Sequence, residues 1–154
     1  MEMTEKEVGE FNEVLKDYLD DPRVRKMKDY VAHGSVNVLS HSLNVARTAY
    51  MLNKRFKANC DLKTLLTGAL LHDFYQYDWH NARLSMNVFK MHGFTHPEAA
   101  CENAVKEFSV DERVQEVIRC HMWPLTLRSM PRHKEAILVC IADKLCATKE
   151  TVRR

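Results

Sequence analysis

The sequence predicts an all-α fold, a bundle of helices in a single domain. Its 154 residues match the usual length of one domain, about 100–200 residues. Only 4 Gly and 4 Pro are present, too few for the many turns of a sandwich or barrel built from short strands. Apolar residues recur instead at spacings of three and four, which is the period of an amphipathic helix.

The first 30 residues are expected to form a helical extension. One face of a helix over residues 5–19 carries apolar side chains at helical spacing, namely Val8, Phe11, Leu15 and Leu19. The run Asp-Asp-Pro at 20–22 ends this helix, because proline cannot continue it. A second, shorter helix is expected over residues 24–30.

A loop and a long helix are expected next. Residues 31–38 are largely polar and include a glycine, which favours a loop. The helix that follows is capped near Asn37 or Ser40 and extends to about Lys57. Its inward face consists of Val38, Ser42, Val45, Ala49, Leu52 and Phe56. His41 lies at the edge of that face.

Asp61 is expected to cap the next helix, over residues 62–74. The apolar face of that helix consists of Leu62, Leu65, Leu66, Ala69 and Leu70. Continuing the same spacing leads to His72 and Asp73, so both polar side chains are predicted to point inward.

The second half of the chain is also predicted to be helical. Residues 75–91 are expected to be weakly helical, and Gly93 is expected to end that segment. Pro97 suits the first turn of a new helix, where its missing N–H costs nothing. A further helix begins at Asp111. The last helix, residues 134–149, is apolar on nearly every side and is expected to lie deep in the core.

Charge and composition exclude several classes of function. The net charge of +2 is spread along the chain, so a basic stripe for a nucleic acid polymer is missing. The longest apolar stretches fall far short of the ~20 residues of a membrane span, and the acidic N-terminus is unlike a signal peptide. A cytoplasmic location is therefore expected. The five cysteines form no CxxC pair, which predicts reduced, packed thiols.

Six ionisable residues fall at or near the buried face of a helix end. They are His41, His72, Asp73, His96, His121 and Asp143. Taken singly, each has an ordinary interpretation as a core polar group that bonds to the backbone, since an unpaired one would cost several kcal/mol. Taken together, four imidazoles and two carboxylates from five helices form a ligand set that suits Fe, Mn, Co, Ni or Zn.

The order of these residues, His, His-Asp, His, His and Asp, resembles the HD superfamily of metal-dependent phosphohydrolases. The resemblance covers about residues 33–148 and includes the runs HSLNVA at 41–46, GALLHD at 68–73 and IADK at 141–144. It implies a helical bundle of the HD-domain type over residues 1–154, with 1–30 as an N-terminal extension and 31–149 as the metal-binding core.

The resemblance also implies a ligand set. The basic metal site of the family would be formed by His41, His72, Asp73 and Asp143. His96 and His121 match the subgroup that holds two metals, such as the HD-GYP phosphodiesterases and the dinucleoside-tetraphosphate hydrolases. In that arrangement Asp73 bridges both ions. We therefore expect two divalent ions, Fe or Mn, and the same ligands are compatible with Zn, Co, Ni and Mg.

The implied activity is hydrolysis of a phosphate mono- or diester, in a nucleotide or another small phosphorylated metabolite, by a metal-activated hydroxide. Asp73 and Asp143 are assigned as catalytic. Substrate contacts are predicted for His33, Gln76, His80 and Lys144. Many family members carry Lys at the position of Gln76, and the glycine-tyrosine-proline signature of cyclic dinucleotide enzymes is missing from this sequence. The particular substrate therefore stays open.

Two other functions stay open as well. A minority of proteins that resemble this family use the same ligands in a di-iron oxygenase, which O₂ consumption would distinguish from a hydrolase. A non-catalytic sensor that binds metal or ligand without turnover is the alternative from another class, and Gln76 favours it. Retention of all six ligand positions favours catalysis. Oligomerisation is compatible with the sequence, but no feature identifies an interface.

Overall fold

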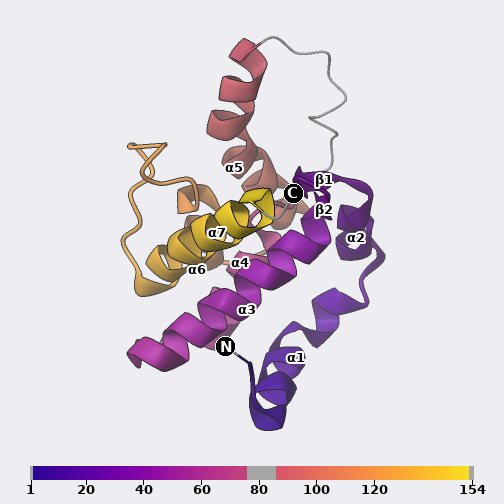
Figure 1. Ribbon diagram of the computed structural model, residues 1–154, viewed down its shortest axis with the longest axis vertical. Coiled ribbons are helices and arrows are strands. Elements are labelled where there is room, and N and C mark those ends of the chain that lie inside the picture. The colour runs from indigo at the N-terminus through magenta and orange to yellow at the C-terminus, as the bar shows by residue number, and fades with distance from the viewer. Residues whose placement is uncertain (1, 76–85, 153–154) are drawn as a thin grey trace.

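Helices dominate the chain, as the sequence predicts (Figure 1). The computed structural model describes residues 2–75 and 86–152, with the backbone alone over 86–94. Within these residues the elements are α1 (Glu5–Leu19), α2 (Pro22–Arg25), the 3-10 helix η1 (Lys26–Asp29), β1 (Val31–His33), β2 (Val36–Asn37), α3 (Val38–Phe56), α4 (Leu62–Leu71), α5 (Met86–Phe108), α6 (Glu112–Cys120) and α7 (Lys134–Val152). The all-α fold class is confirmed.

Side-chain caps set the starts of three helices that carry the site. They are Asn37 before α3, Asp61 before α4 and Asp111 before α6. In each, a side-chain oxygen accepts a hydrogen bond from the backbone N–H three residues later, at 2.9, 2.8 and 3.0 Å respectively. Such a cap is worth about 1 kcal/mol. The predicted starts are confirmed, and of the two candidates for α3 the cap is Asn37 rather than Ser40.

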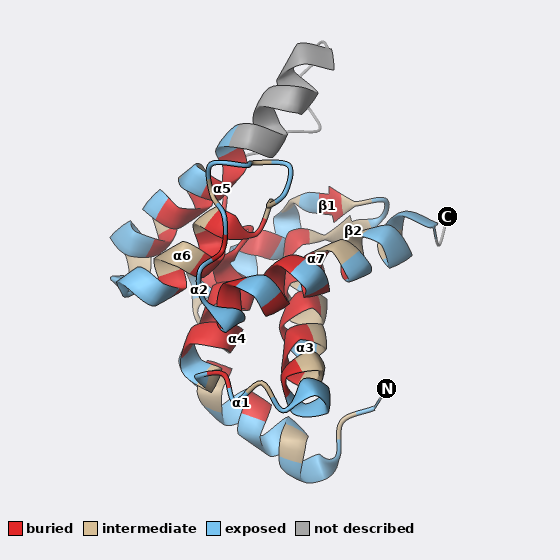
Figure 2. Cartoon of the chain, turned by 90° about the vertical axis from the view of Figure 1, so that its left-hand side faces the viewer, coloured by how far each residue is buried: buried red, intermediate tan, exposed pale blue. Residues whose placement is uncertain are grey.

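Helix α4 contacts α1, α3, α6 and α7, and every one of its residues from 64 to 71 is buried. Figure 2 shows buried residues on the sides of α3 and α4 that face each other. The approach of α4 to α6 depends on Gly68, because a Cβ there would lie 2.5 Å from Cγ1 of Val117 on α6. This close packing brings together the ends of both helices, where the rings of His72 and His121 lie 4.8 Å apart.

Gly68→Ala is expected to destabilise the fold by about 1–3 kcal/mol, because the added methyl group overlaps the buried, stiff side chain of Val117. The change is measured as a lower urea midpoint with an unchanged slope. Gly9→Ala is the matched control, since Gly9 is exposed in α1 and a Cβ there meets nothing within 4 Å. The control is expected to gain up to about 1 kcal/mol. Equal midpoints for the two variants would contradict this contact.

A short hairpin replaces the loop that was expected before α3. β1 and β2 pair antiparallel, with Val31 opposite Asn37 and His33 opposite Val36. Gly34 forms the turn with a φ of 58°, a left-handed conformation that glycine adopts without strain. The two valines favour extended backbone, and the polar residues around them concealed that signal. The hairpin matters because it carries His33 to the site.

Helix α5 is continuous, which contradicts the expected break at Gly93 and the expected helix start at Pro97. Both positions lie inside the helix. Proline removes one hydrogen bond of the helix and crowds the preceding turn. The packing of α5 against α6 outweighs this local cost. The start predicted for this helix from its glycine and proline is therefore wrong.

Helix α7 is only half buried, whereas the sequence predicted a helix deep in the core. Ile137 and Ile141 are each 44% exposed and Leu145 is 54% exposed, and they follow one another at one-turn spacing. The buried face packs on α3, α4 and α6. When apolar residues lie on all sides of a helix, the sequence does not show which side is buried. Burial depends on how many helices pack around α7.

The five cysteines are free and buried, in agreement with the expected packed thiols. Within residues 2–75 and 86–152, no helix has both the length and the apolar character that crossing a membrane requires.

Candidate metal centre

The six predicted ligand residues lie together in one buried cluster. They are His41 on α3, His72 and Asp73 directly after α4, His96 on α5, His121 directly after α6, and Asp143 on α7. None of them is more than 7% exposed. Their ligand atoms form overlapping groups in which each atom lies within 4.8 Å of the others. Buried groups of this composition could hold metal ions, as predicted.

Two of the histidines are held in the same way by the helix that precedes them. α4 ends at Leu71, earlier than the predicted residue 74, and the Nδ1 of His72 donates to the carbonyl of Ala69 at 2.8 Å. The Nδ1 of His121 donates to the carbonyl of Ile118 at 2.6 Å. These carbonyls belong to the last helical turn, where intrahelical partners are lacking. The Nε2 atom of each ring is therefore left to face the cluster.

One half of the cluster contains His41, His72 and both carboxylates. The Nε2 of His41 lies 3.1 Å from Oδ1 of Asp143 and 3.9 Å from Oδ2 of Asp73. The Nε2 of His72 lies 3.4 Å from the same Oδ2 of Asp73 and 3.7 Å from the same Oδ1 of Asp143. Oδ2 of Asp73 and Oδ1 of Asp143 thus both lie within 3.9 Å of the Nε2 atoms of these two rings.

The other half uses the second oxygen of Asp73. Its Oδ1 lies 3.3 Å from Nε2 of His96 and 3.6 Å from Nε2 of His121. The two Nε2 atoms are themselves 2.9 Å apart. Asp73 therefore presents Oδ2 to one pair of histidines and Oδ1 to the other pair, which is the arrangement expected of a carboxylate shared between two ion sites.

Two atoms in the cluster indicate that a cation fits there. The Nε2 of His72 and the Oδ1 of Asp73 are buried without a hydrogen-bond partner among the described residues. A buried polar atom without a partner costs about 1–3 kcal/mol. Imidazole nitrogen and carboxylate oxygen are common ligands of divalent transition metals, and a bound ion would satisfy both atoms.

The electrostatics of the cluster favour a cation. Burial would raise the pKa of Asp73, but nearby imidazoles, led by His72, hold it well below its usual range. A hydrogen bond from His41 and the nearby imidazole of His72 likewise outweigh burial and lower the pKa of Asp143. Burial, with His72 and another imidazole nearby, lowers the pKa of His121 to about 3. Both carboxylates are therefore charged and His121 is neutral at physiological pH.

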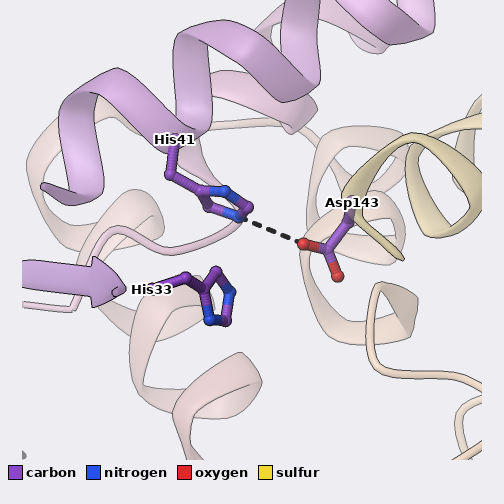
Figure 3. A group of neighbouring side chains, drawn as sticks. All are labelled: His33, His41 and Asp143. Carbon is purple, nitrogen blue, oxygen red and sulfur yellow. Dashed lines mark hydrogen bonds and ion pairs between the residues drawn. The ribbon is translucent and has the colours of Figure 1, made fainter. Parts of the chain in front are cut away.

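His33 lies beside this cluster, on β1 of the hairpin. Figure 3 shows its ring next to His41 from α3 and Asp143 from α7. The rings of His33 and His41 meet edge to face at 4.8 Å. Ligand atoms of the three residues lie within 4.8 Å of one another, and His33 is half buried. Burial lowers the pKa of His33, which favours a neutral ring. A substrate contact for His33 stays a prediction.

Lys144, another predicted substrate residue, lies close to the cluster. Lys144 donates from Nζ to the backbone carbonyl of His121 at 2.7 Å, and Nζ lies 4.0 Å from Oδ2 of Asp143. Its ammonium is thus close to the cluster but is engaged with the backbone. Gln76 and His80 lie outside the described residues.

One residue near the cluster was not identified from the sequence. Glu150 on α7 contacts the Nδ1 of His41 through Oε2 at 2.8 Å. Its spacing of seven from Asp143 corresponds to about two helical turns, so both residues lie on the same face of α7. That spacing is the signal that could have identified it.

The fold and the cluster together define a mainly helical domain with buried histidine and aspartate groups that could hold metal ions. The family model of the HD domain matches residues 38–148, well over half of the chain. The chain belongs to the HD domain family, which confirms the resemblance seen in the sequence. This family includes metal-dependent phosphohydrolases. No curated protein and no solved structure matches the chain.

Proposed function

We propose that this protein is a metal-dependent phosphohydrolase that cleaves a phosphate mono- or diester in a nucleotide or another small phosphorylated metabolite. The observation that carries the proposal is the placement of Asp73, whose two oxygens face two separate pairs of histidines. Membership of the HD domain family supports the same reaction class.

The residues divide naturally between two ions. One ion would be held by His41, His72, Asp73 and Asp143, whose ligand nitrogen and oxygen atoms lie 3.1–3.9 Å apart in pairs. The other would be held by Asp73 together with two further histidines, His96 and His121. We propose Fe or Mn, while Zn, Co, Ni and Mg are compatible with imidazole and carboxylate ligands. Divalent ions supply Lewis acidity, which lowers the pKa of water and neutralises charge on a phosphoryl group.

The side chains of the chain itself would hold and orient the reactants. Asp143, a member of the cluster whose lowered pKa favours the charged form, can accept a hydrogen bond from the attacking water. His33, at the edge of the cluster, can donate to a phosphate oxygen. Water oxygen forms the new bond to phosphorus, the ester bond to phosphorus breaks, and the proton from water ends on the departing oxygen.

The proposal is tested with protein purified without chelator. Elemental analysis identifies the bound metals, and a screen of nucleotides and small phosphate esters with added Mn or Fe measures phosphate or nucleotide release. We expect two metal equivalents per chain and turnover of at least one ester class. Substrate-dependent O₂ consumption without phosphate release would instead show an oxygenase. Metal binding without any turnover would show a sensor, and either result would refute the proposal.

Metal affinity is expected to rise with pH. Burial alone would lower the pKa of His41, but hydrogen bonds to Asp143 and Glu150 outweigh it and raise the pKa to about 10. The neutral ring binds metal, so binding releases this proton. Each proton released makes the apparent affinity rise by about tenfold per pH unit below that pKa. Chelator-competition titrations between about pH 6 and 9 measure the slope. A flat profile would contradict the role of His41.

A further inference from the structure

His41 is oriented differently from His72 and His121. Those two rings donate from Nδ1 to a backbone carbonyl of the preceding helix. The Nδ1 of His41 instead contacts a carboxylate, Oε2 of Glu150 at 2.8 Å, 109 residues further along the chain. A carboxylate on Nδ1 makes the ring a stronger ligand through Nε2 than a neutral carbonyl does. The opposite nitrogen, Nε2, is the atom that faces Asp73 and Asp143.

Glu150 is itself fixed on more than one side. Its second oxygen, Oε1, accepts a hydrogen bond from Nδ2 of Asn44 at 2.9 Å. Asn44 lies three residues after His41 on α3, so both partners of Glu150 share one face of that helix. The backbone at Glu150 is also close to the hairpin, since a Cβ on Gly34 would lie 3.3 Å from its carbonyl oxygen. These contacts leave the carboxylate little freedom to move away from His41.

The burial of Glu150 indicates a role beyond packing. Its side chain is only 9% exposed although it lies in the last turns of α7. A buried carboxylate is costly unless it is paired. Among the described residues its one ion-pair partner is His41. The cost of burying Glu150 is therefore offset by the hydrogen bond from Asn44 and by one ion pair, with the ring that offers Nε2 to the cluster.

We infer that Glu150, held by Asn44, is a positioning residue that fixes the orientation of His41 and strengthens it as a metal ligand. This inference rests on metal binding at the cluster, as in the proposed function. Glu150 is not a ligand itself, because its two oxygens face Nδ1 of His41 and the amide of Asn44. Loss of such a supporting partner typically costs about 10- to 100-fold in metal affinity.

The test is a titration of Mn²⁺ or Zn²⁺ alone into the metal-free full chain, with a chromophoric chelator as competitor. Glu150→Ala is expected to weaken binding by about 10- to 100-fold. Glu150→Gln keeps an acceptor for Nδ1 but loses the charge, so an intermediate loss is expected. Glu102→Gln is the matched control, because it removes the same charge from the exposed face of α5 and should leave the affinity unchanged.

A surface pocket beside Glu150 allows a second measurement of its role. A pocket of about 400 Å³ is lined by Asn44 and Glu150 and also by two cations, Arg47 and Lys149. A small carboxylate could therefore enter the space vacated in Glu150→Ala. Acetate is expected to restore part of the lost affinity in this variant, whereas chloride at equal ionic strength is not. In the unmodified protein acetate should bring no gain.

The outcomes separate this inference from the proposed function. If the unmodified protein binds no metal, both are wrong. If it binds tightly and both Glu150 variants bind equally tightly, only the positioning role is overturned. Circular dichroism checks folding of each variant, and Glu150→Gln, which keeps the size of the side chain, decides the matter if Glu150→Ala loses helical content.

Discussion

An Asp73→Ala variant is expected to lose both its bound metal and its turnover. Asp73 faces His41 and His72 through one oxygen and His96 and His121 through the other, so its removal takes a ligand from both halves of the cluster. Supporting partners of ligands are already worth about 10- to 100-fold in affinity, and we expect the loss of a shared ligand to exceed about 100-fold. Elemental analysis after gel filtration and the phosphate-release assay measure the two effects.

Controls for this variant test whether the loss is local. His72→Ala should lose metal and turnover in the same way, because its Nε2 is one of the two buried cluster atoms without a hydrogen bond. Asp17→Ala removes an exposed carboxylate from α1 and should keep both properties. Helical content by circular dichroism should stay close to that of the unmodified protein in all three. Full metal occupancy in Asp73→Ala would show that the ligand assignment is wrong.

His96→Ala and His121→Ala are each expected to lose one of two metal equivalents and most of the turnover. Both histidines face Oδ1 of Asp73, whereas the remaining ligands surround Oδ2. The residues proposed to hold the first ion therefore stay in place in these variants. Turnover should fall by more than about 100-fold, since two ions together would stabilise the attacking and departing oxygens. Metal per chain and initial rates give the measurement.

The histidine variants have a matched control in the same chain. His133 is half exposed and pairs with Glu116 away from the cluster, so His133→Ala should retain both metal equivalents. A stoichiometry of one in the unmodified protein, unchanged by either His96→Ala or His121→Ala, would favour a mononuclear site. Loss of both equivalents would mean that the two halves bind metal as one cooperative unit.

Several features of the fold could be predicted because they depend on local interactions. The caps Asn37, Asp61 and Asp111 bond to backbone three residues away, so the sequence around each one sufficed. The hairpin before α3 was missed because its two strands are very short, and such strands carry too little alternation to be distinguished from a loop. The start of α5 was misplaced because its breakers, Gly93 and Pro97, are tolerated within a packed helix.

More of the candidate site than of the fold could be predicted from the sequence. The six ligand residues converge in the structure, because inward spacing on separate helices leaves buried His and Asp few places to lie. Glu150 was missed because it is an ordinary glutamate near the end of a helix until His41 is placed beside it. Lys144 was predicted as a substrate contact, which stays a prediction, and its bond to the carbonyl of His121 could not be foreseen.

By itself the sequence determined the all-α class, three helix starts and the chemical nature of the buried cluster, because each depends on residue type and on spacings of three or four. Only the tertiary structure decided which oxygen of Asp73 meets which histidines, that Glu150 holds His41, and that one face of α7 is exposed. Those features join segments as much as 109 residues apart, and their relative placement depends on how all the helices pack at once.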